Sequence, residues 1–383
     1  MKNTTTKKVV LMVVLGLIIA AIVIINSKKP SIPNTPAEDV MAVPIESTPG
    51  ASALDRTAVL AAKADKYSKA KEIKNPTGFV NVDSLKLSDL VGKKVILVDF
   101  WTYSCINCQR TIPYLNAWYN KYKDQGLVIV GVHTPEFDFE KDINNVKAAV
   151  TKAGITYPVV LDSNMGTWNA YGNQYWPHEY LIDIDGYVVH DHIGEGGYDE
   201  TEKAIQAALT ERAQVLGTNA VIPSSITAPT NTVSLNEAGV RSPETYFGAE
   251  RNEFLGNGVQ GKIMNQILTI PSNKKDDTLY LGGTWNFQYE YAENTTTNAQ
   301  IQYNYSAKHV YLVASAKHPV ILKITRDGKP LGVEAGKDVN ADGTVTISEN
   351  RLYDLVSGSD YGAHTLQIEV EGVGLDAYTF TFG

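Results

Sequence analysis

The chain has 383 residues, which is longer than one ordinary domain and predicts two domains joined by connecting segments. Its formal net charge at pH 7 is −8, from 34 basic and 42 acidic side chains. The sequence contains no basic stripe with interleaved aromatic residues, so we exclude nucleic acid as a partner.

The N-terminus contains one long apolar run. From Val9 to Ile25 no residue is charged, and as a helix this run would span roughly 26 Å, marginally enough to cross a bilayer. More basic groups precede the run than follow it, so we expect residues 1–8 to be a cytoplasmic tail and residues 9–26 a transmembrane signal anchor. A cleaved secretory signal is the alternative, although no small-residue cleavage site closely follows the run.

Residues 27–74 have the composition of a tether. The segment is first rich in proline, serine and alanine, then rich in alanine and lysine from Ala51 to Lys74, where a helix is expected. Proline-rich segments are extended and semi-rigid. The tether would therefore hold a folded domain away from the membrane.

Residues 75–216 alternate between strand and helix patterns. Strands are expected, in chain order, at Phe79–Val82, Lys94–Trp101 and Leu127–His133, followed by a hairpin of Glu179–Asp183 and Tyr187–Ile193. Helices are expected at Cys108–Tyr122, Asp138–Ala153 and Asp199–Leu216. The nearly continuous apolar run KVILVDFW is typical of a strand that is buried on both faces. These patterns predict an α/β sheet with helices on both faces.

The pattern changes after this region. Residues 217–241 are rich in threonine, asparagine, serine and proline and lack an apolar period, which indicates a linker. Residues 242–383 contain short runs in which apolar and polar residues alternate, separated by glycine, asparagine and aspartate turns. We therefore expect the second domain to be an all-β sandwich.

The chain has two cysteines, Cys105 and Cys108. They close too small a loop to brace a fold, so the pair indicates chemistry. Both lie where a strand ends and a helix begins, and the helix dipole there lowers the pKa of such a thiol from about 8.5 to roughly 3.5–7.5. Cys105 would be the nucleophile and Cys108 the resolving thiol. A zinc half-site is the alternative, with His190 and His192 as the further ligands.

The surroundings of this pair resemble a known family. VDFW, followed by C-x-x-C and a proline five residues on, is similar to the thioredoxin active-site segment. FWTYSCINCQRTIPYLNAWYNKYKDQGLVIVGVHTPEF, WNAYGNQYWPHEYLIDIDG and GEGGYDETEKAI resemble the TlpA-like thioredoxin domain of DipZ-type cytochrome c biogenesis proteins. The resemblance continues through SPETYFG, DVNADGTVT and RLYDLV to the final TFTFG, and covers nearly all of the chain after about Asn75. The N-terminal part of the chain differs from that family, because one apolar segment stands where the family has a polytopic, CcdA-like membrane domain.

The resemblance implies a thioredoxin-like (redoxin) fold and roles for individual residues. Asp99 matches a buried carboxylate that assists proton transfer at the resolving thiol, and Trp101 an aromatic residue that packs beside the disulfide. Pro177 matches a cis-proline opposite the disulfide, so Trp176 would offer backbone groups to an extended substrate. A carboxylate in an apolar strand has a raised pKa and exchanges protons near neutrality, which suits Asp99. A salt-bridged structural role for Asp99 is the alternative.

We therefore expect a membrane-anchored thiol-disulfide oxidoreductase with its catalytic domain outside the cytoplasm. Its redox group would be the disulfide Cys105–Cys108, with no other cofactor and no metal. Its partners would be extracytoplasmic protein thiols and disulfides. Because reducing power is scarce there, we expect a reductant for cytochrome c maturation or redox homeostasis, recharged in trans by a CcdA- or DsbD-like membrane protein.

Two other functions are open. Thiol peroxidases of the redoxin class place a threonine three residues before the reactive cysteine, as Thr102 stands before Cys105, but Val98 replaces the proline of that pattern. The second alternative is a cell-surface module that binds a glycan or a protein, with a vestigial thioredoxin domain.

The second domain resembles the carbohydrate-binding-module-like domain of DipZ-type proteins. Its aromatic residues could form a platform for a glycan, but filling the core is the favoured interpretation. The residues concerned are Tyr280, Trp285, Tyr289, Tyr291, Tyr303 and Tyr305. The segment from Asp338 to Glu349 matches the calcium-loop pattern of an EF-hand, but its flank cannot form the entering helix, so a hairpin turn is favoured.

Overall fold

The computed structural model describes residues 56–230, 232, 239–240 and 242–383. The predicted cytoplasmic tail, the predicted anchor at residues 9–26 and the first part of the tether lie outside the described residues. Within the described ranges no helix is long and apolar enough to cross a membrane. The helix expected in the tether is present as α2 (Arg56–Lys66).

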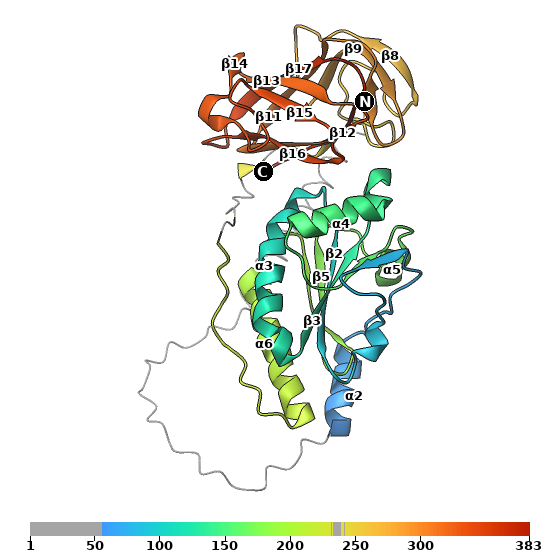
Figure 1. The fold of residues 1–383 in the computed structure, drawn as a ribbon, viewed down its shortest axis with the longest axis vertical. Coiled ribbons are helices and arrows are strands. Elements are labelled where there is room, and N and C mark those ends of the chain that lie inside the picture. The colour runs from blue at the N-terminus through green and yellow to red at the C-terminus, as the bar shows by residue number, and fades with distance from the viewer. Residues whose placement is uncertain (1–55, 231, 233–238, 241) are drawn as a thin grey trace, which may run out of the picture. The chain divides into compact units, whose positions relative to one another are not determined.

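The first domain is built on a six-stranded mixed sheet of order β1-β4-β3-β2-β5-β6 (Figure 1). Its strands are β1 (Gly78–Val80), β2 (Val95–Trp101), β3 (Leu127–His133), β4 (Val159–Leu161), β5 (His178–Ile182) and β6 (Val188–Ile193). Strands β2 and β3 are parallel, whereas β5 and β6 form the predicted antiparallel hairpin. Every residue of β2 is buried, as its apolar run predicts.

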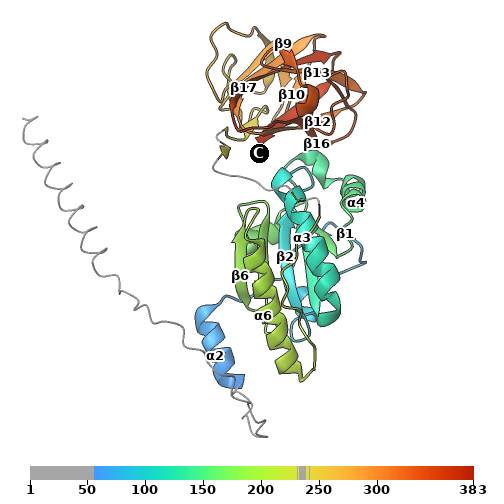
Figure 2. The same ribbon diagram turned by 90° about the vertical axis from the view of Figure 1, so that its left-hand side faces the viewer.

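Helices cover both faces of this sheet. They are α3 (Ile106–Tyr122), α4 (Ile143–Lys152), α5 (Gly166–Tyr171) and α6 (Tyr198–Leu216). Successive residues of a strand point to opposite faces, so Leu97 of β2 packs with α3, α4 and α6, and Val98 packs with α5 on the other face. Figure 2 shows α3 and α6 lying side by side over the sheet. The chain therefore has the expected thioredoxin-like architecture.

The single helix expected at Asp138–Ala153 is wrong in its first part. The chain forms a 3₁₀ turn at Asp138–Lys141 and starts α4 only at Ile143. The Asp142 carboxylate accepts the backbone N–H of Asn144 at 2.8 Å, which is the hydrogen bond of a helix N-cap and begins a new helix. The sequence patterns also did not predict β4 and α5, both of which are short.

The second domain is all β, as expected. Its strands are β7 (Thr245–Tyr246), β8 (Met264–Leu268), β9 (Leu279–Phe287), β10 (Ala292–Asn294), β11 (Ala299–Ser306), β12 (His309–Ala316), β13 (Val320–Arg326), β14 (Lys329–Pro330), β15 (Thr344–Ile347), β16 (Arg351–Ser357), β17 (Ala363–Glu371) and β18 (Leu375–Phe382). The all-β class is confirmed, and the strands pack around one core, but β9 connects the two expected sheets into one 12-stranded sheet.

Strand β9 joins the two halves of that sheet. Its first residues, Leu279–Gly282, pair with β11, and its last residues, Gly283–Phe287, pair with β8. Gly283 has a φ of +93°, and a side chain there would lie 2.7 Å from the Thr296 hydroxyl. A glycine is therefore required where the strand passes from one half to the other.

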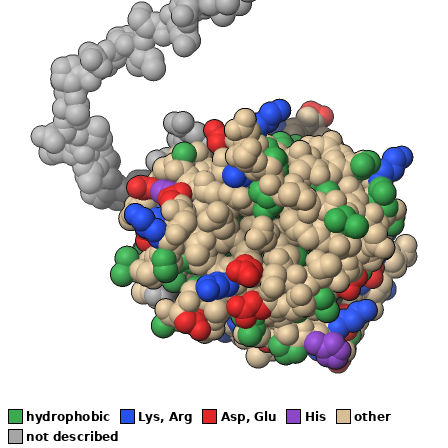
Figure 3. Space-filling model, turned by 90° about the horizontal axis from the view of Figure 1, so that it is seen from above, with side chains coloured by type: hydrophobic (Ala, Val, Ile, Leu, Met, Phe, Trp, Pro, Cys, Tyr) green, Lys and Arg blue, Asp and Glu red, His purple; other side chains and the backbone are tan. Residues whose placement is uncertain are grey.

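Most of the aromatic residues considered for a glycan platform are in the core. Tyr280, Trp285, Tyr303 and Tyr305 are all buried, whereas Tyr289 is 56% exposed. On the face of the molecule drawn in Figure 3, hydrophobic side chains are scattered singly among polar ones. The core interpretation is confirmed for these four residues.

The calcium-like segment forms a turn that leads into β15, but β15 pairs with β13, so the turn does not join two strands of a hairpin. The Asn340 N–H donates to the Thr344 carbonyl at 2.8 Å, just before β15. The two carboxylates at the ends of the pattern, Asp338 and Glu349, pair with Arg351 at 3.0 and 2.8 Å. Arg351 thus pairs with two of the three carboxylates in the pattern.

Candidate active site

The two cysteines lie at the N-terminus of α3, directly after β2. Cys105 is the N-cap residue of the helix and is half-buried, whereas Cys108 is 1% exposed and lies one turn further on. Both are free thiols. Burial raises the pKa of the Cys108 thiol well above its usual value, and the neighbouring Cys105 and Asp99 act in the same direction. The arrangement thus offers one accessible sulfur and one buried sulfur.

Asp99 lies on the face of β2 that packs against α3. The side chain is 1% exposed, and burial raises the pKa of its carboxyl to about 7. Its Oδ1 atom has no hydrogen-bond partner among the described residues. A carboxyl that is half-ionised near neutral pH can accept and return a proton beside Cys108. No ion pair to Asp99 occurs within the described ranges, which does not favour the salt-bridged alternative.

Trp101, at the end of β2, packs with Cys108 in the same hydrophobic cluster. The indole is 1% exposed, and the His133 ring meets it edge to face at 5.1 Å between ring centres. Burial lowers the pKa of His133 to about 3, so this imidazole stays neutral. A side chain at Gly131 would lie 2.9 Å from the indole nitrogen, so β3 makes room for Trp101 with a glycine.

Trp176 and Pro177 lie opposite Cys105. The peptide bond between them is cis, as the resemblance implies. The Cys105 sulfur lies 3.8 Å from the Trp176 carbonyl oxygen, and the Trp176 indole donates to the Thr134 carbonyl at 3.1 Å. The Trp176 ring also packs on Trp168 at 4.3 Å between ring centres. Recognition of a substrate strand by the Trp176 backbone remains a prediction.

Glu140 holds the loop that precedes Cys105, a role that the sequence patterns did not predict. This carboxylate is fully buried and accepts hydrogen bonds from the hydroxyls of Thr102 at 2.5 Å and Ser104 at 2.6 Å. It also accepts the backbone N–H groups of Glu136 at 2.7 Å and Phe137 at 3.0 Å. Burial raises the pKa of Glu140, and these hydrogen bonds partly oppose the rise. Only its depth in the fold distinguishes Glu140 from a surface glutamate.

The motif also contacts the second domain. Ile106 is 6% exposed and belongs to a hydrophobic cluster with Tyr311, Leu352 and other residues of that domain. Arg110, two residues beyond Cys108, donates to the Tyr311 hydroxyl at 3.1 Å. One flank of the C-x-x-C motif is therefore covered.

A cavity of about 610 Å³ lies beside the motif. Trp101 and Tyr103 line it from the first domain, and Arg351 and Leu352 line it from the second. A substrate segment bound there would contact both domains.

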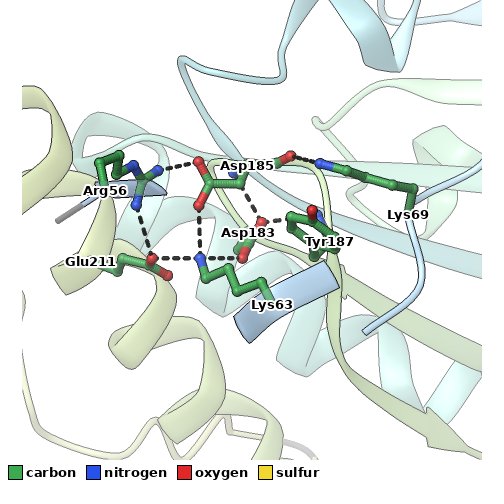
Figure 4. Close-up of polar contacts among 7 residues, drawn as sticks. All are labelled: Arg56, Lys63, Lys69, Asp183, Asp185, Tyr187 and Glu211. Carbon is green, nitrogen blue, oxygen red and sulfur yellow. Dashed lines mark hydrogen bonds and ion pairs between the residues drawn. The ribbon is translucent and has the colours of Figure 1, made fainter. Parts of the chain in front are cut away.

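One carboxylate cluster has the composition of a metal site. Among the described residues, Asp183, Asp185 and Glu211 form the one group of three or more acidic, histidine or cysteine side chains close enough to share an ion. Figure 4 shows that the Lys63 ammonium of α2 lies among the three carboxylates and that Arg56 pairs with two of them. Two protein cations therefore balance most of the negative charge of the cluster, and their ion pairs attach α2 to the domain.

The predicted zinc alternative has no such grouping. The two cysteines and the histidines of β6 do not form a ligand cluster within the part of the chain that the structure describes.

Comparisons with known proteins agree with this geometry. Residues 67–191 match the AhpC/TSA family, and residues 242–383 match a family described as thioredoxin like C-terminal domain. The chain is 37% identical to Protein DipZ of Mycobacterium tuberculosis over 326 residues, which are 84% of this chain and 44% of that protein. The chain thus spans less than half the length of this relative.

Two shorter relatives are covered over most of their length. Thiol-disulfide oxidoreductase YkuV of Bacillus subtilis is 34% identical over 122 residues, which are 32% of this chain and 82% of YkuV. Thiol-disulfide oxidoreductase ResA of Bacillus thuringiensis is 35% identical over 145 residues, which are 37% of this chain and 79% of ResA. The fold, the paired thiols and these relatives agree. The chain therefore belongs to the thioredoxin-like thiol-disulfide oxidoreductases.

Proposed function

We propose that the protein reduces disulfides of proteins outside the cytoplasm through Cys105 and Cys108, in cytochrome c maturation or redox homeostasis. The observation that carries the proposal is the placement of the two sulfurs. Cys105 is accessible at the N-terminus of α3, and Cys108 is buried one turn further on. The most oxidising C-x-x-C proteins owe their potential to a stabilised nucleophilic thiolate in the reduced form. Ile106 and Asn107 place no cation between the two cysteines, which supports a reductant.

The reaction follows from the positions of the two sulfurs. The thiolate of Cys105, the accessible one, attacks a substrate disulfide, forms a mixed disulfide and releases one substrate thiolate. Cys108 then gives its proton to the Asp99 carboxylate and attacks the Cys105 sulfur. The Cys105–Cys108 disulfide forms, and the second substrate sulfur leaves as a thiolate. Two electrons pass from the protein dithiol to the substrate disulfide.

The direction is tested by measuring the reduction potential of the purified chain in glutathione or dithiothreitol buffers. We expect a value near that of thioredoxin, about −270 mV. A value near about −120 mV, or a pair that stays oxidised in living cells whether or not a membrane electron donor is present, would instead identify a disulfide-forming oxidase. Hydrogen peroxide consumption that requires Cys105 would favour the peroxidase alternative.

A reductant outside the cytoplasm must be recharged. We propose that a CcdA- or DsbD-like membrane protein supplies electrons in trans and that the apolar segment at residues 9–26 anchors the chain beside it at high effective concentration. The similarity to Protein DipZ and the apolar run support this arrangement. The test is in-cell alkylation of the pair before and after deletion of the donor, together with carbonate extraction of membranes. A chain released by carbonate would refute the anchor.

Glycan binding by the second domain remains a weaker proposal. It is supported by the resemblance to carbohydrate-binding modules and by the exposed ring of Tyr289, whereas four of the other aromatic residues are buried. Binding of the full chain to a glycan array, compared with a Tyr289→Ala variant, tests it.

A further inference from the structure

The resolving step leaves a proton in a buried place. Cys108 and Asp99 are each 1% exposed, so a proton that moves from this thiol to this carboxyl does not reach solvent directly. Reduction of the disulfide can return it to Cys108, but where Asp99 is already protonated that proton must leave before Cys108 can give up its own. The release of this proton matters only if the Cys105–Cys108 pair carries out the proposed thiol-disulfide exchange.

Glu179 is the first group beyond Asp99. The two residues are directly opposite each other in the antiparallel pair of β2 and β5, on the face that packs against α3 and α6. Side chains in such a pair have Cβ atoms about 4.5–5.5 Å apart. Glu179 is 2% exposed, and its Oε2 atom, like Oδ1 of Asp99, has no hydrogen-bond partner in the described part of the chain. Two buried carboxyls thus face each other with a free oxygen on each.

Thr201 and His190 continue from Glu179 toward solvent. Thr201 lies in the first turn of α6 and is fully buried, and its hydroxyl lies close enough to the Glu179 carboxyl to lower the pKa of that carboxyl. The same hydroxyl lies 3.1 Å from Nε2 of His190, on β6. His190 is only half-buried, and Figure 2 shows α6 and β6 side by side. The hydroxyl therefore connects a buried carboxyl to an imidazole that reaches the surface.

We propose that Glu179, Thr201 and His190 form a proton path that carries the proton of Cys108 from Asp99 to solvent and returns it when the disulfide is reduced. Outward, Glu179 takes the proton from Asp99, the Thr201 oxygen accepts it from Glu179, and the hydroxyl passes its own proton to Nε2 of His190. In the reverse direction the same groups deliver a proton to the Cys108 thiolate released from the disulfide. No electrons move along the path.

The charged and titratable neighbours are consistent with this role. Burial and Asp99 raise the pKa of Glu179, so it can carry a proton near neutral pH. Burial and the nearby His192 lower the pKa of His190, whereas Asp191 and Glu200 act in the opposite direction. The imidazole is therefore neutral and can accept a proton.

Two further groups face the path. The phenol of Tyr157 is buried without a hydrogen-bond partner in the described residues and faces the carboxyls of Asp99 and Glu179. His192 is opposite Glu179 in the pair of β5 and β6, but no hydrogen bond is found for its buried Nε2 in the described residues. The proposed route therefore runs through Thr201, whose hydroxyl is hydrogen-bonded to His190.

The test compares Thr201→Val with Thr201→Ser in the full chain. The reduced protein is mixed with excess dithiobis(nitrobenzoate) in a stopped-flow instrument. The first thionitrobenzoate released reports attack by Cys105, and the second reports resolution by Cys108. We expect Thr201→Val to leave the first phase unchanged and to slow the second by about tenfold or more in molecules whose Asp99 is protonated at the start, because Cys108 must wait there until that proton leaves. The slowing should be greatest below pH 7, where most Asp99 carboxyls are protonated. Thr201→Ser, which keeps the hydroxyl, should restore the second phase.

Two controls separate a proton path from a packing role. Thr210→Val, on the same helix, removes an exposed hydroxyl that donates to the Gln206 carbonyl, and should change neither phase. His190→Gln should slow the second phase and alter its pH dependence, while circular dichroism shows a folded chain. A normal second phase in both Thr201→Val and His190→Gln, or equal slowing in Thr201→Val and Thr201→Ser, would refute the path. If the wild-type chain shows no first phase, thiol exchange itself fails, which is a different result.

Discussion

Because the carboxyl of Asp99 is buried, the free energy of unfolding should fall as the pH rises. The pKa of this carboxyl is 3.8 in an unfolded chain and about 7 in the fold, because burial disfavours the charged form. The folded state therefore binds the proton more tightly. The stabilisation that this gives is complete below about pH 4 and is lost as the pH rises through about 7.

The size of this effect follows from the pKa values. The difference of about 3 between 3.8 and about 7 corresponds to about 4 kcal/mol at about 1.36 kcal/mol for each pH unit. Asp99→Asn removes the titration and keeps a neutral side chain of the same shape. We expect the variant and the wild type to be similar in stability near pH 4, and the variant to be more stable by about 4 kcal/mol near pH 8.

The assay is urea unfolding of the purified chain, followed by tryptophan fluorescence at several pH values. Asp124→Asn, at an exposed aspartate, is the matched control and should follow the wild type at every pH. A difference between Asp99→Asn and the wild type that stays constant from pH 4 to pH 8 would show that the carboxyl is not held neutral by the fold. The same variant should also slow resolution by Cys108.

Three further predictions follow from individual contacts. Cys108→Ser should trap substrates as mixed disulfides on Cys105, identified by mass spectrometry; finding none while the wild type reduces insulin would reject this division of roles. Glu140→Ala leaves buried donors unpaired and should cost about 3 kcal/mol of unfolding free energy, with Glu140→Gln costing about 1; equal losses would contradict the hydrogen-bond explanation. Lys63→Met leaves three carboxylates without their shared cation and should lower stability by about 2 kcal/mol in denaturant melts; an unchanged melt would show that α2 contributes little.

Local patterns in the sequence identified the chemistry of this protein. A strand that ends in C-x-x-C and continues as a helix places one thiol at the helix N-terminus and the other a turn inside, and this needs only neighbouring residues. The same is true of the apolar strand Val95–Trp101 and the hairpin of β5 and β6, whose periods are visible over a few residues. Asp99 could be selected because it interrupts an apolar strand.

The tertiary structure alone decided which other polar groups serve the site. Glu140 lies in a segment whose pattern predicts a helix, yet the N-cap at Asp142 starts the helix only after it. The carboxylate of Glu140 is instead buried in the core. Glu179 faces Asp99 only because β2 and β5, far apart in sequence, pair in one register. The burial of a carboxyl and the register of its strand both depend on contacts between distant segments of the chain. These contacts determine the pKa of the carboxyl, whereas a local sequence pattern contains only the neighbouring residues along the chain.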